Sequence, residues 1–191
     1  MTTMAYDFKI VGFGLSAGGM TPLLEILEDL PAQLNAAIVV VMHLPINASS
    51  KLHQILSQKV AINVVPVSTI EQVEPGNIYV MDAGKELRIQ NGFLEMHERN
   101  PEEKINKTID KFFKSLAGDA GSQSIGIILS GAGFDGLEGA KEIEDAKGIV
   151  IVQDPETAQF PLMPKNLIAY DHPDYVLTPK DIAEKLTKQL A

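Results

Sequence analysis

Hydrophobic residues along this chain fall into two kinds of segment that alternate from the N-terminus onward. Uninterrupted apolar runs are typical of strands buried on both faces of a parallel sheet, and apolar residues between them recur at the spacing of one helix face. The pattern predicts strands at 8–13, 36–42, 61–67, 124–130, 149–152 and 174–177. It predicts helices at 22–30, 51–56, 105–116, 137–146 and 179–190.

Local signals mark the ends of several of these helices. Thr21 is a candidate N-cap with Pro22 at the first helical position, and Ser49 and Ser50 are candidate caps of the second helix. A glycine, Gly118 or Gly121, is expected near the end of the helix that begins at Ile105.

Three short strands, at 76–81, 86–89 and 93–96, interrupt the alternation. Asn91-Gly92 between the last two is a strong signal for a type I′ hairpin turn, so this stretch predicts an antiparallel excursion at an edge or flap. The remaining alternation predicts an α/β fold with a doubly wound, mostly parallel sheet and helices on both faces.

Composition narrows the class of protein. The 191 residues show no repeat or linker, so we expect a single domain over 1–191. Absence of cysteine excludes a thiolate nucleophile, and a net charge of −9 argues against binding the phosphate backbone of nucleic acid. No leader or membrane-spanning run is evident, so we expect a cytoplasmic protein without membrane insertion.

Three residues with catalytic chemistry follow predicted strands. Ser16 lies in the glycine-rich turn 12–19, His43 follows the second strand, and Asp135 lies in a second glycine-rich turn, 131–136. Parallel strands present their carboxyl ends at one edge, where ligands of such sheets bind. The three residues therefore predict a nucleophile, a general base and a carboxylate that orients the base.

Each residue also has a simpler interpretation, as a turn hydroxyl, a strand-end histidine and a helix N-cap. Their joint position on one edge favours catalysis, and Gly14-Leu15-Ser16-Ala17-Gly18 matches the nucleophile-elbow pattern.

Other site types fit less well. Gly12, Gly14 and Ala17 match the relaxed dinucleotide spacing, but His43 stands where a ribose-binding acid is required. A phosphate loop would need Gly-Lys-Ser/Thr after its glycines. An α/β-hydrolase could use Ser16, Asp135 and His172, but only fifteen residues precede Ser16 to supply its upstream oxyanion donor. The histidines lack metal-ligand spacing, so no metal site is expected.

The motifs together resemble the CheB-type protein-glutamate methylesterases of bacterial chemotaxis signalling. The stretches 11–19, 39–45 and 127–136 look like the family's serine turn, histidine strand and aspartate turn, and 75–80, 109–117 and 153–158 are further matches. Lys85-Glu86-Leu87-Arg88 and the Ser-Gly-Ala-Gly turn look closer to the subgroup fused to methyltransferase and sensory domains.

The resemblance implies a three-layer α/β fold and a serine hydrolase that removes methyl groups from γ-glutamyl methyl esters. Methanol would be released, and glutamine deamidation would be a related activity. The resemblance assigns Ser16 as nucleophile, His43 as general base and Asp135 as its partner, with no cofactor. The expected partners are a methylated chemoreceptor or related signalling protein and a separate regulatory protein, since no receiver domain precedes residue 1.

Two positions depart from the family pattern. Ala17 stands where the chemotaxis enzymes commonly have threonine, and Ala132 where they have methionine, so only the backbone N–H groups there are expected to serve an oxyanion hole. The same departures support an alternative hypothesis, a non-catalytic regulatory or interaction module that retains the fold.

Overall fold

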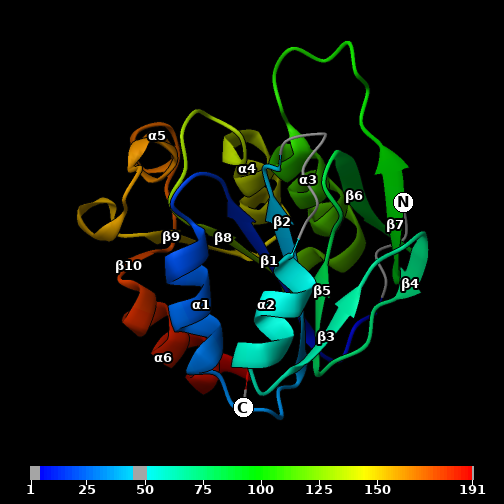
Figure 1. Ribbon diagram of the computed structural model, residues 1–191. Coiled ribbons are helices and arrows are strands. Elements are labelled where there is room, and N and C mark those ends of the chain that lie inside the picture. The colour runs from blue at the N-terminus through cyan, green and yellow to red at the C-terminus, as the bar shows by residue number, and fades with distance from the viewer. Residues whose placement is uncertain (1–4, 45–50, 191) are drawn as a thin grey trace.

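The computed structural model describes residues 5–44 and 51–190, which form a seven-stranded sheet in the order β10-β9-β8-β1-β2-β5-β3 (Figure 1). All six strand pairings in this sheet are parallel. The strands are β1 (Lys9–Leu15), β2 (Ala36–Met42), β3 (Asn63–Pro66), β5 (Asn77–Val80), β8 (Ser124–Ile128), β9 (Ile149–Gln153) and β10 (Tyr175–Leu177). The central strands β1, β2 and β8 are almost wholly buried, as their unbroken apolar runs predict.

Helices cover both faces of the sheet and create two separate hydrophobic cores (Figure 1). One face packs against α1 (Met20–Glu28), α2 (Leu52–Lys59) and α6 (Pro179–Leu190). The other packs against α3 (Thr108–Ala120), α4 (Leu137–Asp145) and α5 (Leu162–Tyr170). Short 3-10 turns occur at Gly121–Gln123 and Pro155–Thr157. The three-layer, doubly wound α/β prediction is confirmed.

A small antiparallel sheet joins β4 (Ile70–Gln72), β7 (Phe93–Glu98) and β6 (Lys85–Gln90). Positive φ angles at Asn91 and Gly92, 52° and 82°, confirm the predicted hairpin turn. The strand predicted at 76–81 does not belong to this excursion: as β5 it pairs in parallel with β2 and β3. A short strand that enters a sheet's interior and one that begins a hairpin have the same apolar pattern.

Several predicted helix boundaries were wrong by a few residues. α1 begins at Met20 with Gly19 as its N-cap, so Pro22 lies in its first turn, where a missing N–H costs no hydrogen bond. α3 begins at Thr108, and Ile105 lies outside it with 69% of its surface exposed. The candidate caps Ser49 and Ser50 lie outside the described residues.

Close approach of α3 to the sheet sets the position of the helix N-terminus. A Cβ on Gly14 of β1 would come within 2.5 Å of the Ile109 side chain. Glycine at this position therefore lets the first turn of α3 lie against the end of β1, beside the predicted catalytic residues.

Candidate active site

The candidate site lies at the carboxyl ends of β1, β2 and β8, in the middle of the sheet. From β1, the chain places β2, β5 and β3 on one side and β8, β9 and β10 on the other. Such a change of direction opens a crevice beyond the strand ends, because the loops that follow the two neighbouring strands diverge.

Ser16 directly follows β1 and begins a tight turn. Its N–H donates to Ser130 O at 3.1 Å, and its carbonyl accepts from Gly19 N at 3.1 Å. Gly18 has a φ of +73°, and a Cβ on Gly131 would come within 2.9 Å of Ser16 Cβ. The serine is thus held between its own turn and the loop after β8, with its side chain partly exposed.

His43 directly follows β2 and lies beside Ser16. Leu15 pairs with Met42 in the parallel register, and His43 N donates to Leu15 O at 3.2 Å. Neighbouring strands lie about 4.8 Å apart, so the residues just beyond this pair, Ser16 and His43, are neighbours at the sheet edge.

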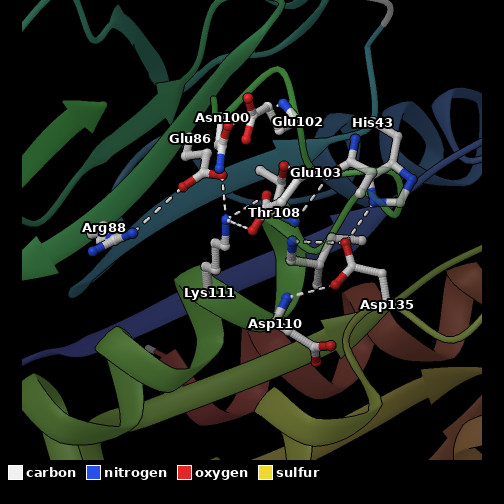
Figure 2. A network of polar contacts seen from close by, with 12 residues as sticks. His43, Glu86, Arg88, Asn100, Glu102, Glu103, Thr108, Asp110, Lys111 and Asp135 are labelled. Carbon is white, nitrogen blue, oxygen red and sulfur yellow. Dashed lines mark hydrogen bonds and ion pairs between the residues drawn. The ribbon is translucent and has the colours of Figure 1, made fainter. Parts of the chain in front are cut away.

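Asp135 contacts the imidazole of His43 directly. His43 Nε2 and Asp135 Oδ2 are 2.5 Å apart (Figure 2), and their side chains are 19% and 3% exposed. The carboxylate also accepts from the first turn of α3, with Ile109 N donating to Oδ2 at 2.9 Å and Asp110 N to Oδ1 at 2.8 Å. A helix N-terminus favours negative charge, so this contact supports the ionised carboxylate that a protonated imidazole needs.

The pairing leaves one imidazole nitrogen for the serine. With Nε2 donating to Asp135, Nδ1 is the acceptor available to Ser16. Among residues 5–44 and 51–190, Ser16 Oγ forms no hydrogen bond with His43. Catalytic hydrogen bonds are often loose without substrate.

The proposed oxyanion donors, the N–H groups of Ala17 and Ala132, differ from the N–H of Gly131 in their hydrogen bonding. Gly131 N donates to Phe160 O at 2.9 Å, whereas the N–H groups of Ala17 and Ala132 have no acceptor in the described part of the chain. Both alanines are exposed. Their N–H groups are therefore available to a ligand.

A pocket of about 520 Å³ adjoins the histidine and aspartate. The apolar residues Ile105, Phe134, Leu137 and Ala132 contribute to its walls. Ile105 and Phe134 are 69% and 57% exposed, so the rim offers hydrophobic contacts to a ligand that reaches His43.

Sequence reasoning missed the polar groups that support the site. Ser130 has no exposed surface; its Oγ donates to Ala17 O at 3.0 Å and accepts from Phe160 N at 2.9 Å. Gln153 Oε1 accepts from Ser130 N at 2.9 Å. Both polar residues end otherwise apolar strand runs, which is the signal that could have identified them.

Asp110 is a second buried carboxylate near the site, 4% exposed. Burial raises its pKa to about 6; an N–H donated by Gly139 opposes that rise, and the neighbouring charge of Asp135 adds to it.

The remaining histidines do not approach the site. Asp135 contacts His43 rather than His172, which lies in the exposed connection after α5. His53 lies in α2, and His97 lies in β7, 3.5 Å from Glu95.

Within the described ranges, no three His, Asp or Glu side chains are grouped to hold a metal ion. Nor does any described helix have the length and apolar character needed to cross a bilayer.

Comparison with known proteins gives consistent matches along the chain. A family model described as CheB methylesterase matches residues 11–186. A Leptospira interrogans protein provisionally named protein-glutamate methylesterase/protein-glutamine glutaminase is 32% identical over 181 residues, 93% of each chain. A Thermotoga maritima protein with that name is 34% identical over 194 residues, 97% of this chain and 55% of the longer relative.

The fold matches a solved structure equally well. The crystal structure of the Thermotoga maritima CheB methylesterase catalytic domain gives a TM-score of 0.87 at 32% identity. The match covers 96% of this chain and 100% of that domain.

Proposed function

The chain belongs to the CheB methylesterase family, and from this premise we propose that it hydrolyses glutamate γ-methyl esters on a chemoreceptor-like protein. The observation that carries the proposal is the 2.5 Å contact between His43 and Asp135, next to Ser16 at the sheet edge. A buried carboxylate that holds a histidine beside a serine is the arrangement that nucleophilic ester cleavage requires.

In the first half of the reaction, Ser16 Oγ attacks the ester carbonyl carbon while His43 Nδ1 accepts the hydroxyl proton. Asp135 stabilises the resulting imidazolium, and the N–H groups of Ala17 and Ala132 donate to the tetrahedral oxyanion. Collapse of this intermediate breaks the bond to the methoxy oxygen. That oxygen takes the proton from His43 and leaves as methanol, so that the glutamyl group remains as an ester on Ser16.

In the second half, a water molecule gives a proton to His43 and attacks the glutamyl ester. Collapse of the second tetrahedral intermediate breaks the bond to Ser16 Oγ, which takes the proton back from His43, and releases the glutamate carboxylic acid, which ionises. A glutamine side chain can follow the same route with ammonia as leaving group. The name of the Leptospira relative joins both activities, and we extend that pairing to this chain.

Apolar side chains around the pocket support a protein substrate. Ile105 and Phe134 flank the approach to His43 and could cover the uncharged methyl ester and its neighbours on a partner surface. A net charge of −9 opposes a nucleic-acid substrate. We propose that the reaction takes place in the cytoplasm, on the cytoplasmic part of a methylated signalling protein.

Substitution of Ser16 tests the function. Ser16→Ala should abolish methanol release from a methylated receptor, because the acyl-enzyme cannot form, while the circular dichroism spectrum stays unchanged. Ser57→Ala, an exposed serine of α2, is the control and should retain full activity. Methanol release by the Ser16 variant at the wild-type rate would contradict the proposal.

A further inference from the structure

We propose that Asp110 is a positioning residue, which holds Asp135 in the orientation that contacts His43; this inference rests on the proposed function. The carboxylates of Asp110 and Asp135 each accept hydrogen bonds from the backbone of the segment that carries the other. Asp135 accepts two N–H groups from the first turn of α3, and Asp110 Oδ1 accepts from Gly136 N at 3.0 Å and Gly139 N at 2.8 Å. Each segment thus supplies the acceptor for the other's free amides.

The direction of the Asp110 side chain is consistent with these reciprocal hydrogen bonds. Figure 2 shows its main-chain nitrogen facing Asp135 while its carboxylate points away from that residue. The acceptor oxygen is instead directed to the N-terminus of α4, immediately after Asp135. Asp110 therefore acts on Asp135 through the backbone and does not compete for the His43 ring.

Asp110 is the side chain that fixes the turn on the C-terminal side of Asp135, whereas on the N-terminal side Asn166 Nδ2 donates to Gly133 O at 2.7 Å. Gly133 and Gly136 have φ angles of +98° and +96°, and the helix N-cap at Gly136 has no side-chain hydrogen bond of its own. Gly136 and Gly139 are buried, so water could not replace the Asp110 carboxylate as the acceptor for their N–H groups. Loss of this acceptor frees the turn to reorient the adjacent carboxylate.

Ionisation of Asp110 should make the hydrogen bonds to Gly136 and Gly139 depend on pH. Asp110 faces the carboxylates of Asp135 and Glu138, the ammonium group of Lys114 and the N–H of Gly139. Its pKa of about 6 means that the acceptor is ionised above that pH and neutral below it. A neutral carboxyl accepts more weakly, so the turn should loosen as the pH falls through this value.

Two substitutions separate the hydrogen bonds from the charge. Asp110→Ala removes the acceptor, whereas Asp110→Asn keeps an acceptor oxygen of the same size and removes the titration. Asp119→Ala is the matched control: it is also a buried carboxylate of α3 that accepts two backbone N–H groups, from Asn91 and Gly92, but at the hairpin.

Steady-state kinetics provide the first measurement. We expect Asp110→Ala to lower kcat by about 10- to 100-fold with little change in KM, because a displaced Asp135 misorients His43. Asp110→Asn should keep kcat within about threefold of wild type, and Asp119→Ala should leave it unchanged. Equal kcat values for Asp110→Ala and the control would overturn the proposal.

Proton NMR of the His43 ring provides a measurement that does not need turnover. The Nε2 proton in the 2.5 Å contact with Asp135 should give a downfield signal in wild type, Asp110→Asn and Asp119→Ala, and none in Asp110→Ala. A retained signal in Asp110→Ala overturns positioning even if the wild-type protein proves inactive. Loss of the downfield signal in Asp110→Ala and in no other variant supports the positioning role of Asp110, whether or not methanol is released.

If Asp110→Ala does not fold, Asp110→Asn decides the question. In wild type the downfield signal should weaken as the pH falls through about 6, and in Asp110→Asn that step should be missing. The same step in both proteins would overturn the proposal.

Discussion

Each proposed catalytic residue depends on backbone groups far away in the sequence. Asp135 is held by two amides of α3, and Ser16 by the carbonyl of Ser130. The hydroxyl of Ser130 also reaches Ala17, 113 positions away. Hydrogen bonds therefore tie the turn of Ser16 to the loop after β8, so that loss of one of them should affect the proposed catalysis as well as stability.

Ser130 provides a prediction at this scale. Ser130→Ala should lower the free energy of unfolding by about 1–3 kcal/mol, because the buried Ser130 hydroxyl makes two hydrogen bonds, one to Ala17 O and one from Phe160 N. It should also lower kcat. The Ala17 carbonyl loses its hydrogen bond from Ser130, so the N–H of Ala17 can move away from the position of the oxyanion. Denaturant unfolding and methanol release measure the two effects.

Ser124 is the matched control for that prediction. It is equally buried, lies at the other end of β8, and donates to Gly121 O at 2.6 Å. Ser124→Ala should lower stability and leave the kcat of the folded enzyme unchanged. If the two variants had the same kcat, the proposed link between Ser130 and the serine turn would be wrong.

At the scale of helices and strands, the sequence was most informative where burial dominates. Unbroken apolar runs predicted β1, β2 and β8, because a strand between two helical layers needs apolar residues on both faces. α5 was not predicted: Pro161 and Pro164 appeared to break the chain, yet both fall at its N-cap and first turn, where proline is tolerated.

The candidate site was predictable only in part, for a related reason. Ser16, His43 and Asp135 stand out because each ends a strand or turn whose position follows from the pattern. Asp110 and Ser130 do not, because their partners are distant in the sequence. Packing of α3 against α4 brings Gly136 and Gly139 to Asp110, and the turn after β1 and the segment before α5 bring Ala17 and Phe160 to Ser130. A carboxylate in a helix's first turn is usually explained by the helix alone.

Glu144 on α4 gives a prediction about pH and stability. Burial and the neighbouring carboxylates, chiefly Asp171, raise its pKa from 4.5 to about 7. Between these values the folded state binds more protons than the unfolded state, so the free energy of unfolding should fall as the pH rises through this window. Glu144→Gln removes the titration and should stabilise the protein more at about pH 8 than at about pH 5.

Denaturant unfolding at the two pH values checks this prediction. Glu142→Gln, an exposed position on the same helix, serves as control and should show no such difference. An equal effect of Glu144→Gln at both pH values would show that its carboxyl does not titrate in the expected window.

At the scale of the whole molecule, the order of strands brings the site together. β1 lies between β2 and β8, so the segments after three strands meet although Ser16 and Asp135 are more than a hundred residues apart. The two cores fix this sheet from both faces, and α3 and α4 lie side by side on one of them (Figure 1). Asp110 of α3 accepts from the start of α4, and Asp135, just before α4, accepts from the start of α3, which links the second core to the sheet edge where Ser16 lies.

The central claim is that this assembly makes Ser16 a nucleophile, and a serine-reactive fluorophosphonate tests it most directly. Mass spectrometry of the labelled protein should find one modified peptide, which contains Ser16, and His43→Ala should lose the label. Substrate identity does not enter this measurement. Absence of labelling, or labelling of Ser16 that does not depend on His43, would contradict the claim and favour a non-catalytic module with the same fold.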